Sequence, residues 1–164
     1  MRSSFLSDKQ FSEMYEKHFA TMFKMDWNET NKDDHGIDLF DVDKEIYIDV
    51  KCYTKPKFVK CFTGIFIETY LPLSGRNGWL FDENKKTTHY LFIKNCSREK
   101  VEYEEAWLVK RENVIAILDE LLMTNQCEYK EIASAGGYIL PYNILNAICE
   151  KRFKQFNNEN RMGA

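Results

Sequence analysis

Apolar residues recur at helical spacing near the start of the chain and then give way to short alternating runs. Ser7 and Gln10 have the spacing of a capping box, and we predict a helix that begins there and extends to about Met25. Its buried stripe comprises Phe11, Met14, Tyr15, His18, Phe19 and Met22. Glu16 falls at the margin of this stripe, about 120° from its centre.

The alternating runs predict a β-hairpin after a polar loop at residues 26–34. Residues 37–42 form the first strand, Asp43 and Lys44 make a tight connection, and residues 45–53 form the second strand. Side chains of a strand point alternately to its two faces. Three apolar residues (Ile46, Ile48, Val50) therefore face one way, and Asp49 and Lys51 share the other face beside Tyr47.

Further strands are predicted at residues 64–70, 88–93, 106–109 and 137–140, and helices at 114–123 and 144–153. A turn is expected at residues 72–78. The chain has no internal repeat or linker-like segment, so we predict one domain over residues 1–164. Its core would span residues 7–123, followed by a strand and helix at about 136–156 and a tail at 157–164. The order of elements indicates an α/β or α+β fold with a central mixed sheet flanked by helices.

Composition is that of a globular protein, with 44% hydrophobic, 30% charged and 15% aromatic residues. The five cysteines are scattered without close pairs, which argues against a zinc site and favours reduced thiols. Residues 1–5 lack the apolar core of a signal peptide, and no apolar run approaches membrane-spanning length, so we expect a cytoplasmic protein without a membrane association. The net charge of −3 argues mildly against binding of polyanions.

The candidate chemistry lies in the predicted hairpin, where Asp38 is followed after ten residues by Asp49-Val50-Lys51. Pairing of the two strands would bring Asp38 and Asp49 close together near one end. Two adjacent carboxylates repel each other unless a cation lies between them. Mg²⁺, or Mn²⁺ in its place, prefers such oxygen ligands and can activate a water for attack on a phosphate. Lys51 projects beside Asp49 and can reach that water or a phosphate oxygen.

These residues resemble the motif of the PD-(D/E)xK nuclease superfamily, whose fold is restriction-endonuclease-like. Gly36-Ile37-Asp38 and Ile48-Asp49-Val50-Lys51 match its two acidic positions and its lysine, with Ile37 where many members have proline. The resemblance implies a core in the order α-β-β-β-α-β over residues 7 to about 123. Within the superfamily, the pattern is most similar to that of junction-resolving and phage-type endonucleases. This similarity implies a homodimer.

Many members of this family add a glutamate from the first helix, and Glu16 matches that position. An exposed helix glutamate without a role in the site is the alternative. Glu68, on the strand after the lysine, is either a further metal ligand, a hydrogen-bonding group of the same pocket, or directed elsewhere. Residues that would contact the nucleic-acid backbone are basic and follow the motif, namely Lys55, Lys57, Lys60 and Arg76. An exposed lysine-rich loop that only maintains solubility is the alternative for the first three.

The sequence thus predicts a Mg²⁺-dependent nuclease that hydrolyses phosphodiester bonds of DNA, with a structure-specific, junction-resolving activity as the finer expectation. Asp38 and Asp49 would be metal ligands, Glu16 a further ligand, and Lys51 the residue that acts on the water or phosphate. RNA is the second choice of substrate. The alternative from another class is a catalytically inactive relative that binds nucleic acid or a protein partner.

Overall fold

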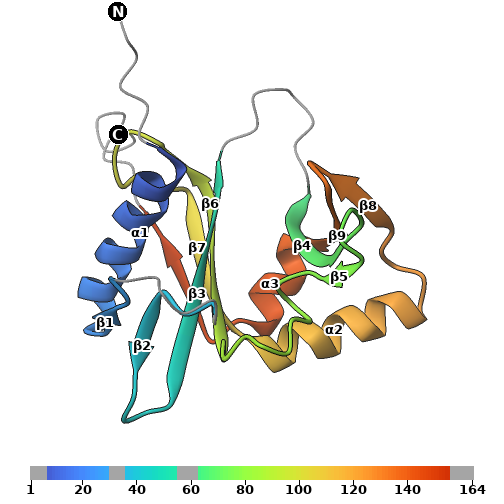
Figure 1. The fold of residues 1–164 in the computed structure, drawn as a ribbon, viewed down its shortest axis with the longest axis horizontal. Helices are drawn as coiled ribbons and strands as arrows, with labels where there is room; N and C mark the ends of the chain where they lie inside the picture. The colour runs from blue at the N-terminus through green and yellow to red at the C-terminus, as the bar shows by residue number, and fades with distance from the viewer. Residues whose placement is uncertain (1–6, 30–35, 55–62, 156–164) are drawn as a thin grey trace, which may run out of the picture.

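A computed structural model describes residues 7–29, 36–54 and 63–155, and it is an α+β structure with a mixed central sheet (Figure 1). In chain order, the elements of these residues are α1 (Asp8–Phe23), β1 (Asp26–Trp27), β2 (Leu39–Asp41), β3 (Ile46–Thr54), β4 (Gly64–Leu71), β5 (Arg76–Asn77), β6 (His89–Cys96), β7 (Glu105–Lys110), α2 (Arg111–Met123), β8 (Tyr129–Ile132), β9 (Ala135–Pro141), α3 (Tyr142–Ile148) and β10 (Lys151–Lys154).

The central sheet has six strands in the order β1-β2-β3-β6-β7-β10. β2 and β3 form the predicted hairpin, and their turn includes Asp43 and Lys44. β3 pairs with β6 in parallel, whereas the other neighbouring strands of this sheet are antiparallel. β6 is apolar on both faces because both faces of the sheet are covered.

α1 packs on one face of this sheet, against β3 (Figure 1). The predicted capping box is present, since the Ser7 side chain accepts a hydrogen bond from the Gln10 main chain and the Gln10 side chain accepts one from Ser7. The helix ends at Phe23, where Lys24 adopts a left-handed conformation with a φ of 55°. The predicted buried stripe is wrong at Met22, which is 42% exposed, because the buried face is turned toward Glu16 and Ala20.

The other face of the central sheet packs on a second hydrophobic cluster, formed with α2, α3 and a second sheet (Figure 1). That second sheet has four strands in the order β5-β4-β9-β8. The third predicted strand, β4, therefore does not continue the hairpin of β2 and β3 but pairs with β9. The chain between the parallel strands β3 and β6 contains β4 and β5, and among its described residues there is no helix. In this segment the observed connectivity therefore differs from the predicted α-β-β-β-α-β core, because the strand after the hairpin belongs to the second sheet.

The C-terminal part also differs from the prediction. The helix expected at residues 144–153 is α3, which ends at Ile148, and residues 151–154 are the edge strand β10, paired with β7. Arg152 of this strand hydrogen-bonds to the buried Glu105 on β7, a contact that residue periodicity does not reveal. The short strands β1, β5 and β8 were also not predicted as strands.

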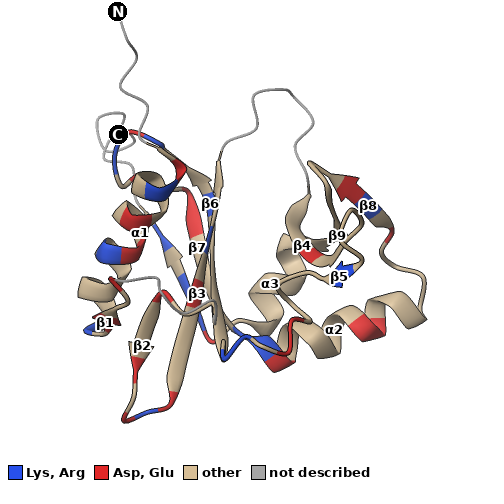
Figure 2. Ribbon diagram, viewed as in Figure 1, with Lys and Arg blue, Asp and Glu red and all other residues tan. Residues whose placement is uncertain are grey.

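Among the described helices, none has the length and apolar character needed to cross a membrane. Basic and acidic positions are interspersed along α1 and both sheets (Figure 2).

Candidate active site

β3 carries the two central residues of the predicted site. Ile48 and Val50 are buried in the cluster formed with α1, so the alternation of the strand directs Asp49 and Lys51 to the opposite face. The predicted neighbourhood of these two side chains is confirmed, since Lys51 Nζ lies 3.0 Å from Asp49 Oδ2. Lys51 Nζ also lies 5.0 Å from the centre of the Trp79 ring, a cation–π contact on its other side.

Asp38 lies directly before β2, at the point where pairing between β2 and β3 ends. Its main-chain N–H donates to the carbonyl of Ile48 at 2.8 Å, which places it opposite Asp49 in the hairpin. Its side-chain Oδ2 accepts a hydrogen bond from the Val50 N–H at 2.7 Å. The carboxylate of Asp38 is thus fixed against the main chain of the strand that carries Asp49.

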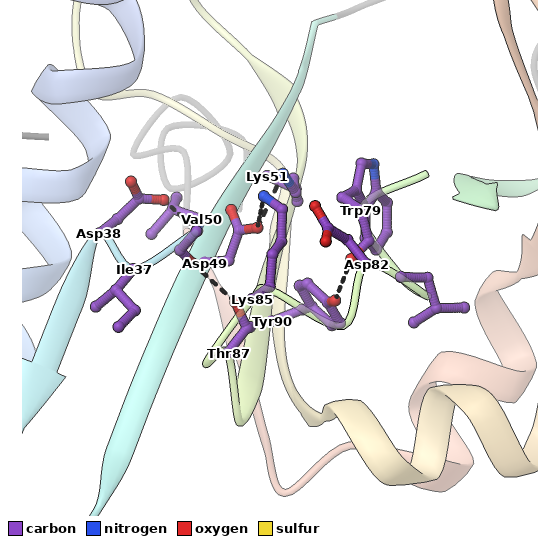
Figure 3. A network of polar contacts seen from close by, with 12 residues as sticks. Ile37, Asp38, Asp49, Val50, Lys51, Trp79, Asp82, Lys85, Thr87 and Tyr90 are labelled. Atoms are coloured by element: carbon purple, nitrogen blue, oxygen red, sulfur yellow. Dashed lines mark hydrogen bonds and ion pairs between the residues drawn. The ribbon is translucent and has the colours of Figure 1, made fainter. Parts of the chain in front are cut away.

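The carboxylate of Asp49 has a different environment from that of Asp38. Its side chain is only 6% exposed, and a second ammonium group, that of Lys85, lies 3.8 Å from the same Oδ2 atom that Lys51 approaches. Figure 3 shows both lysines directed at Asp49, while Asp38 is directed at Val50. Both lysines balance the charge of Asp49, but among the described residues no donor meets the buried Asp49 Oδ2 with the geometry of a hydrogen bond.

The acidic side chains perturb one another although their partners differ. Burial, followed by the charges of Asp49 and Glu16, raises the pKa of Asp38 to about 7. Burial also raises the pKa of Glu16, with the charges of Glu13 and Asp49 adding to the effect. Carboxylic acids with raised pKa values near one another are frequent at functional sites.

Glu16 is buried, which decides the open question about its exposure. It comes from α1, on the face of β3 opposite to Asp49, and its Oε2 accepts a hydrogen bond from Trp27 Nε1 at 2.9 Å. In residues 7–29, 36–54 and 63–155, no three His, Cys, Asp or Glu side chains are gathered closely enough to hold a metal ion. The main chains of Asp38 and Asp49 lie opposite each other as expected. Their carboxylates, however, have different partners: Asp38 accepts from the Val50 N–H, and Asp49 pairs with the two lysines.

The remaining candidate residues are distributed over other parts of the molecule. Glu68 lies on β4, in the second sheet, and its Oε1 accepts a hydrogen bond from the Trp79 N–H at 3.2 Å. It therefore supports the tryptophan that contacts Lys51. Arg76 is exposed on β5, the edge strand of the second sheet. The three predicted backbone-binding lysines, Lys55, Lys57 and Lys60, lie outside the described residues.

Two residues of this site were missed by the sequence analysis, namely Lys85 and Trp79. Both lie between β5 and β6, in a segment where neither strand nor helix periodicity indicates which side chains turn inward. Trp79 is held by ring contacts with Tyr90 and Phe92, at centroid distances of 4.8 and 6.2 Å. A glycine directly before the motif is a local sign of a special backbone conformation, and Gly36 indeed has a positive φ of 67°. The sign does not reveal that Lys85 packs against this glycine.

Comparison with known proteins yields no match to a family model, a curated protein or a solved structure. The arrangement combines one acidic side chain on β3 and another directly before β2 with two ammonium groups near one buried oxygen. Chemically, such a site can hold a cation at its carboxylates and an anion at its lysines.

Proposed function

We propose that this protein is a Mg²⁺-dependent nuclease that hydrolyses phosphodiester bonds of DNA. The observation that carries the proposal is the β2–β3 edge, where Asp38 lies opposite Asp49 and Lys51 Nζ lies 3.0 Å from Asp49 Oδ2. This is the combination of acid, acid and lysine that the PD-(D/E)xK pattern implies. A structure-specific activity on branched DNA is the finer form of the proposal.

The donor set suits a hard divalent cation, because it consists of carboxylate oxygens and includes one buried oxygen without a hydrogen-bond donor in the described chain. Asp38 and Asp49 would hold Mg²⁺ or Mn²⁺, whereas Glu16, on the opposite face of β3 and hydrogen-bonded to Trp27, would act on Asp38 through its charge. Burial is the main cause of the raised pKa of Asp38, and repulsion from Asp49 and Glu16 adds to it, so a bound cation would offset the cost of ionising this carboxyl group. A bound ion supplies an activated water and neutralises charge on the phosphate.

Lys51 would act on the substrate itself. Its side chain is 23% exposed and its ammonium group is paired with Asp49, so this lysine lies at the boundary between the buried carboxylate and solvent. The Trp79 ring beneath it limits its range of positions. An ammonium group fixed at this place can donate to a phosphate oxygen or orient the attacking water.

A cleavage panel tests the proposal. Supercoiled plasmid, linear duplex, single strand, four-way junction and RNA are incubated with the wild-type protein in Mg²⁺, Mn²⁺ or EDTA. We expect metal-dependent cleavage of DNA, and loss of cleavage in Lys51→Ala. Lys44→Ala is the matched control, because Lys44 is exposed in the hairpin turn and pairs only with the neighbouring Asp41 among the described residues. Absence of cleavage on every substrate, or full activity of Lys51→Ala, would contradict the proposal.

One observation favours a second candidate function, an inactive relative that binds nucleic acid. Lys51 and Lys85 already place two positive charges at Asp49 Oδ2, which is where a metal ion would bind. Titration calorimetry with Mg²⁺ and Mn²⁺ separates the two candidates. Heat of binding that disappears in Asp49→Asn supports the nuclease, whereas DNA binding without any metal binding supports the inactive relative.

A further inference from the structure

We propose that Lys85 is a second substrate-contacting residue of this site and binds a phosphate of the nucleic acid together with Lys51. This inference rests on the proposed function and adds a residue to it. Nothing in the sequence pattern indicates Lys85, which lies 34 positions beyond Lys51. Its Nζ is nevertheless 3.8 Å from Asp49 Oδ2 and shares that oxygen with Lys51 (Figure 3).

The Lys85 side chain packs against Gly36, and main-chain hydrogen bonds hold the loop that carries it. On one side it crosses Gly36 so closely that a Cβ atom there would lie 2.7 Å from its Nζ and 2.8 Å from its Cδ. Thr87 supports the same approach, since its Oγ1 donates to the carbonyl of Gly36 at 2.9 Å. Gly36 immediately precedes Ile37-Asp38, so Lys85 packs against the segment that carries the first acidic residue.

The loop that carries Lys85 is held from the other side by Arg111, at the start of α2. Its guanidinium group donates four hydrogen bonds of 2.8 to 3.0 Å to main-chain carbonyls of Leu80, Asp82 and Lys85. A lysine on a loop fastened in this way loses little conformational entropy when it binds a ligand. Arg111 is therefore a positioning residue for Lys85.

The two lysines outnumber the carboxylates in direct contact with them. Asp49 is the one carboxylate in the described residues within 4 Å of either Lys51 or Lys85, so two positive charges face one negative charge. Each ammonium group has three donors, and neither makes a well-oriented hydrogen bond to Asp49 Oδ2. The Lys85 side chain is 18% exposed, so part of it is in contact with solvent. A phosphate has both the charge and the acceptors that this pair lacks.

Binding measurements without catalysis test Lys85 directly. A fluorescein-labelled DNA duplex is titrated with protein over a series of salt concentrations, in EDTA and in Ca²⁺, and anisotropy gives Kd. We expect Lys85→Met to weaken binding several-fold and to lower the slope of log Kd against log salt by about 1. Lys85→Arg, which keeps the charge, should restore the slope.

The matched control is Lys86→Met. Lys86 is the exposed neighbour of Lys85 in the same loop, so this substitution removes the same formal charge. Its effect on Kd and slope should be clearly smaller. Equal effects of Lys85→Met and Lys86→Met would overturn the inference, and so would a wild-type protein that binds no DNA in either buffer. Thermal unfolding of each variant verifies that the fold is retained, and Lys85→Arg serves as the folded reference if Lys85→Met is unstable.

The two proposals fail in different ways. If the wild type cleaves DNA but Lys85→Met binds and cleaves like Lys86→Met, the nuclease assignment stands and the role of Lys85 is wrong. If the wild type binds DNA with the expected dependence on Lys85 but cleaves no substrate with any metal, the phosphate contact stands and the nuclease assignment is wrong.

Discussion

Two buried carboxylates on the central sheet, Asp49 and Glu105, have opposite environments. Glu105 on β7 accepts a hydrogen bond from the Nε of Arg152 on the neighbouring strand β10. Asp49 on β3 has two ammonium groups at one oxygen, yet that oxygen has no hydrogen-bond donor among the described residues. The hydrogen bond to Glu105 joins the neighbouring strands β7 and β10. The Asp49 carboxylate is left with unused acceptor capacity beside a further acid of raised pKa, Asp38.

The comparison shows that burial of a charge does not by itself indicate a functional site. An ion pair with a direct hydrogen bond, such as that between Glu105 and Arg152, has a structural role, so its disruption should lower the stability of the fold. An ion pair that remains unsatisfied next to other acids has a cost that a ligand can remove. The following predictions test this distinction.

The largest effect is expected for Asp49→Asn. Because the side chain loses its charge while its size is unchanged, cleavage with Mg²⁺ should fall by on the order of 10³-fold or more. Glu105→Gln is the matched variant, and its cleavage rate should stay within about twofold of the wild type, while its Tm falls by roughly a few degrees. Single-turnover cleavage and thermal unfolding measure the two effects. A Glu105→Gln protein as inactive as Asp49→Asn would remove the distinction.

The next effect concerns the pH dependence of stability. Because the folded state raises the pKa of Asp38 from 3.8 to about 7, the wild type loses stability as pH rises through this window. Asp38→Asn cannot ionise and keeps an acceptor for the Val50 N–H. In EDTA we expect it to be more stable than the wild type by about 1–3 kcal/mol at pH 8, discounted for partial exposure, with little difference near pH 4.

Chemical denaturation at both pH values measures this difference. Addition of Mg²⁺ at pH 8 should narrow it, because the ion stabilises the ionised wild type and not the variant. Lower stability of Asp38→Asn at pH 8 would show that the carboxylate is favourable in the fold and is not held there for a cation.

The smallest effect is expected for Arg76→Ala. Arg76 is exposed on the second sheet, so its proposed contact is with the nucleic-acid backbone and not with the reacting phosphate. Binding should weaken about twofold to threefold, and the salt slope should fall by about 1, with kcat unchanged. A change in kcat without a change in binding would place Arg76 in the site itself.

Much of the fold follows from local periodicity. The capping box, the hairpin with its turn, and the alternation that brings Asp49 beside Lys51 are all present as predicted. The partners of strands were harder to predict, because a strand of the same composition can pair in either of two sheets. β4 therefore pairs with β9, more than 60 residues further along the chain, and not with the hairpin.

Alternation in the extended chain is enough to predict which face of β3 each side chain occupies. The hairpin pattern likewise indicates that Asp38 lies near Asp49 at one end of the paired strands. Only the tertiary structure decided that Glu16 is buried, that Asp38 is held by the Val50 main chain and that Lys85 reaches Asp49. The burial of Glu16 depends on the rotation of α1, and the contact of Asp38 depends on where pairing of β2 and β3 ends. The position of Lys85 depends on a loop that is hydrogen-bonded to Arg111. All three are set by packing between segments distant in the chain.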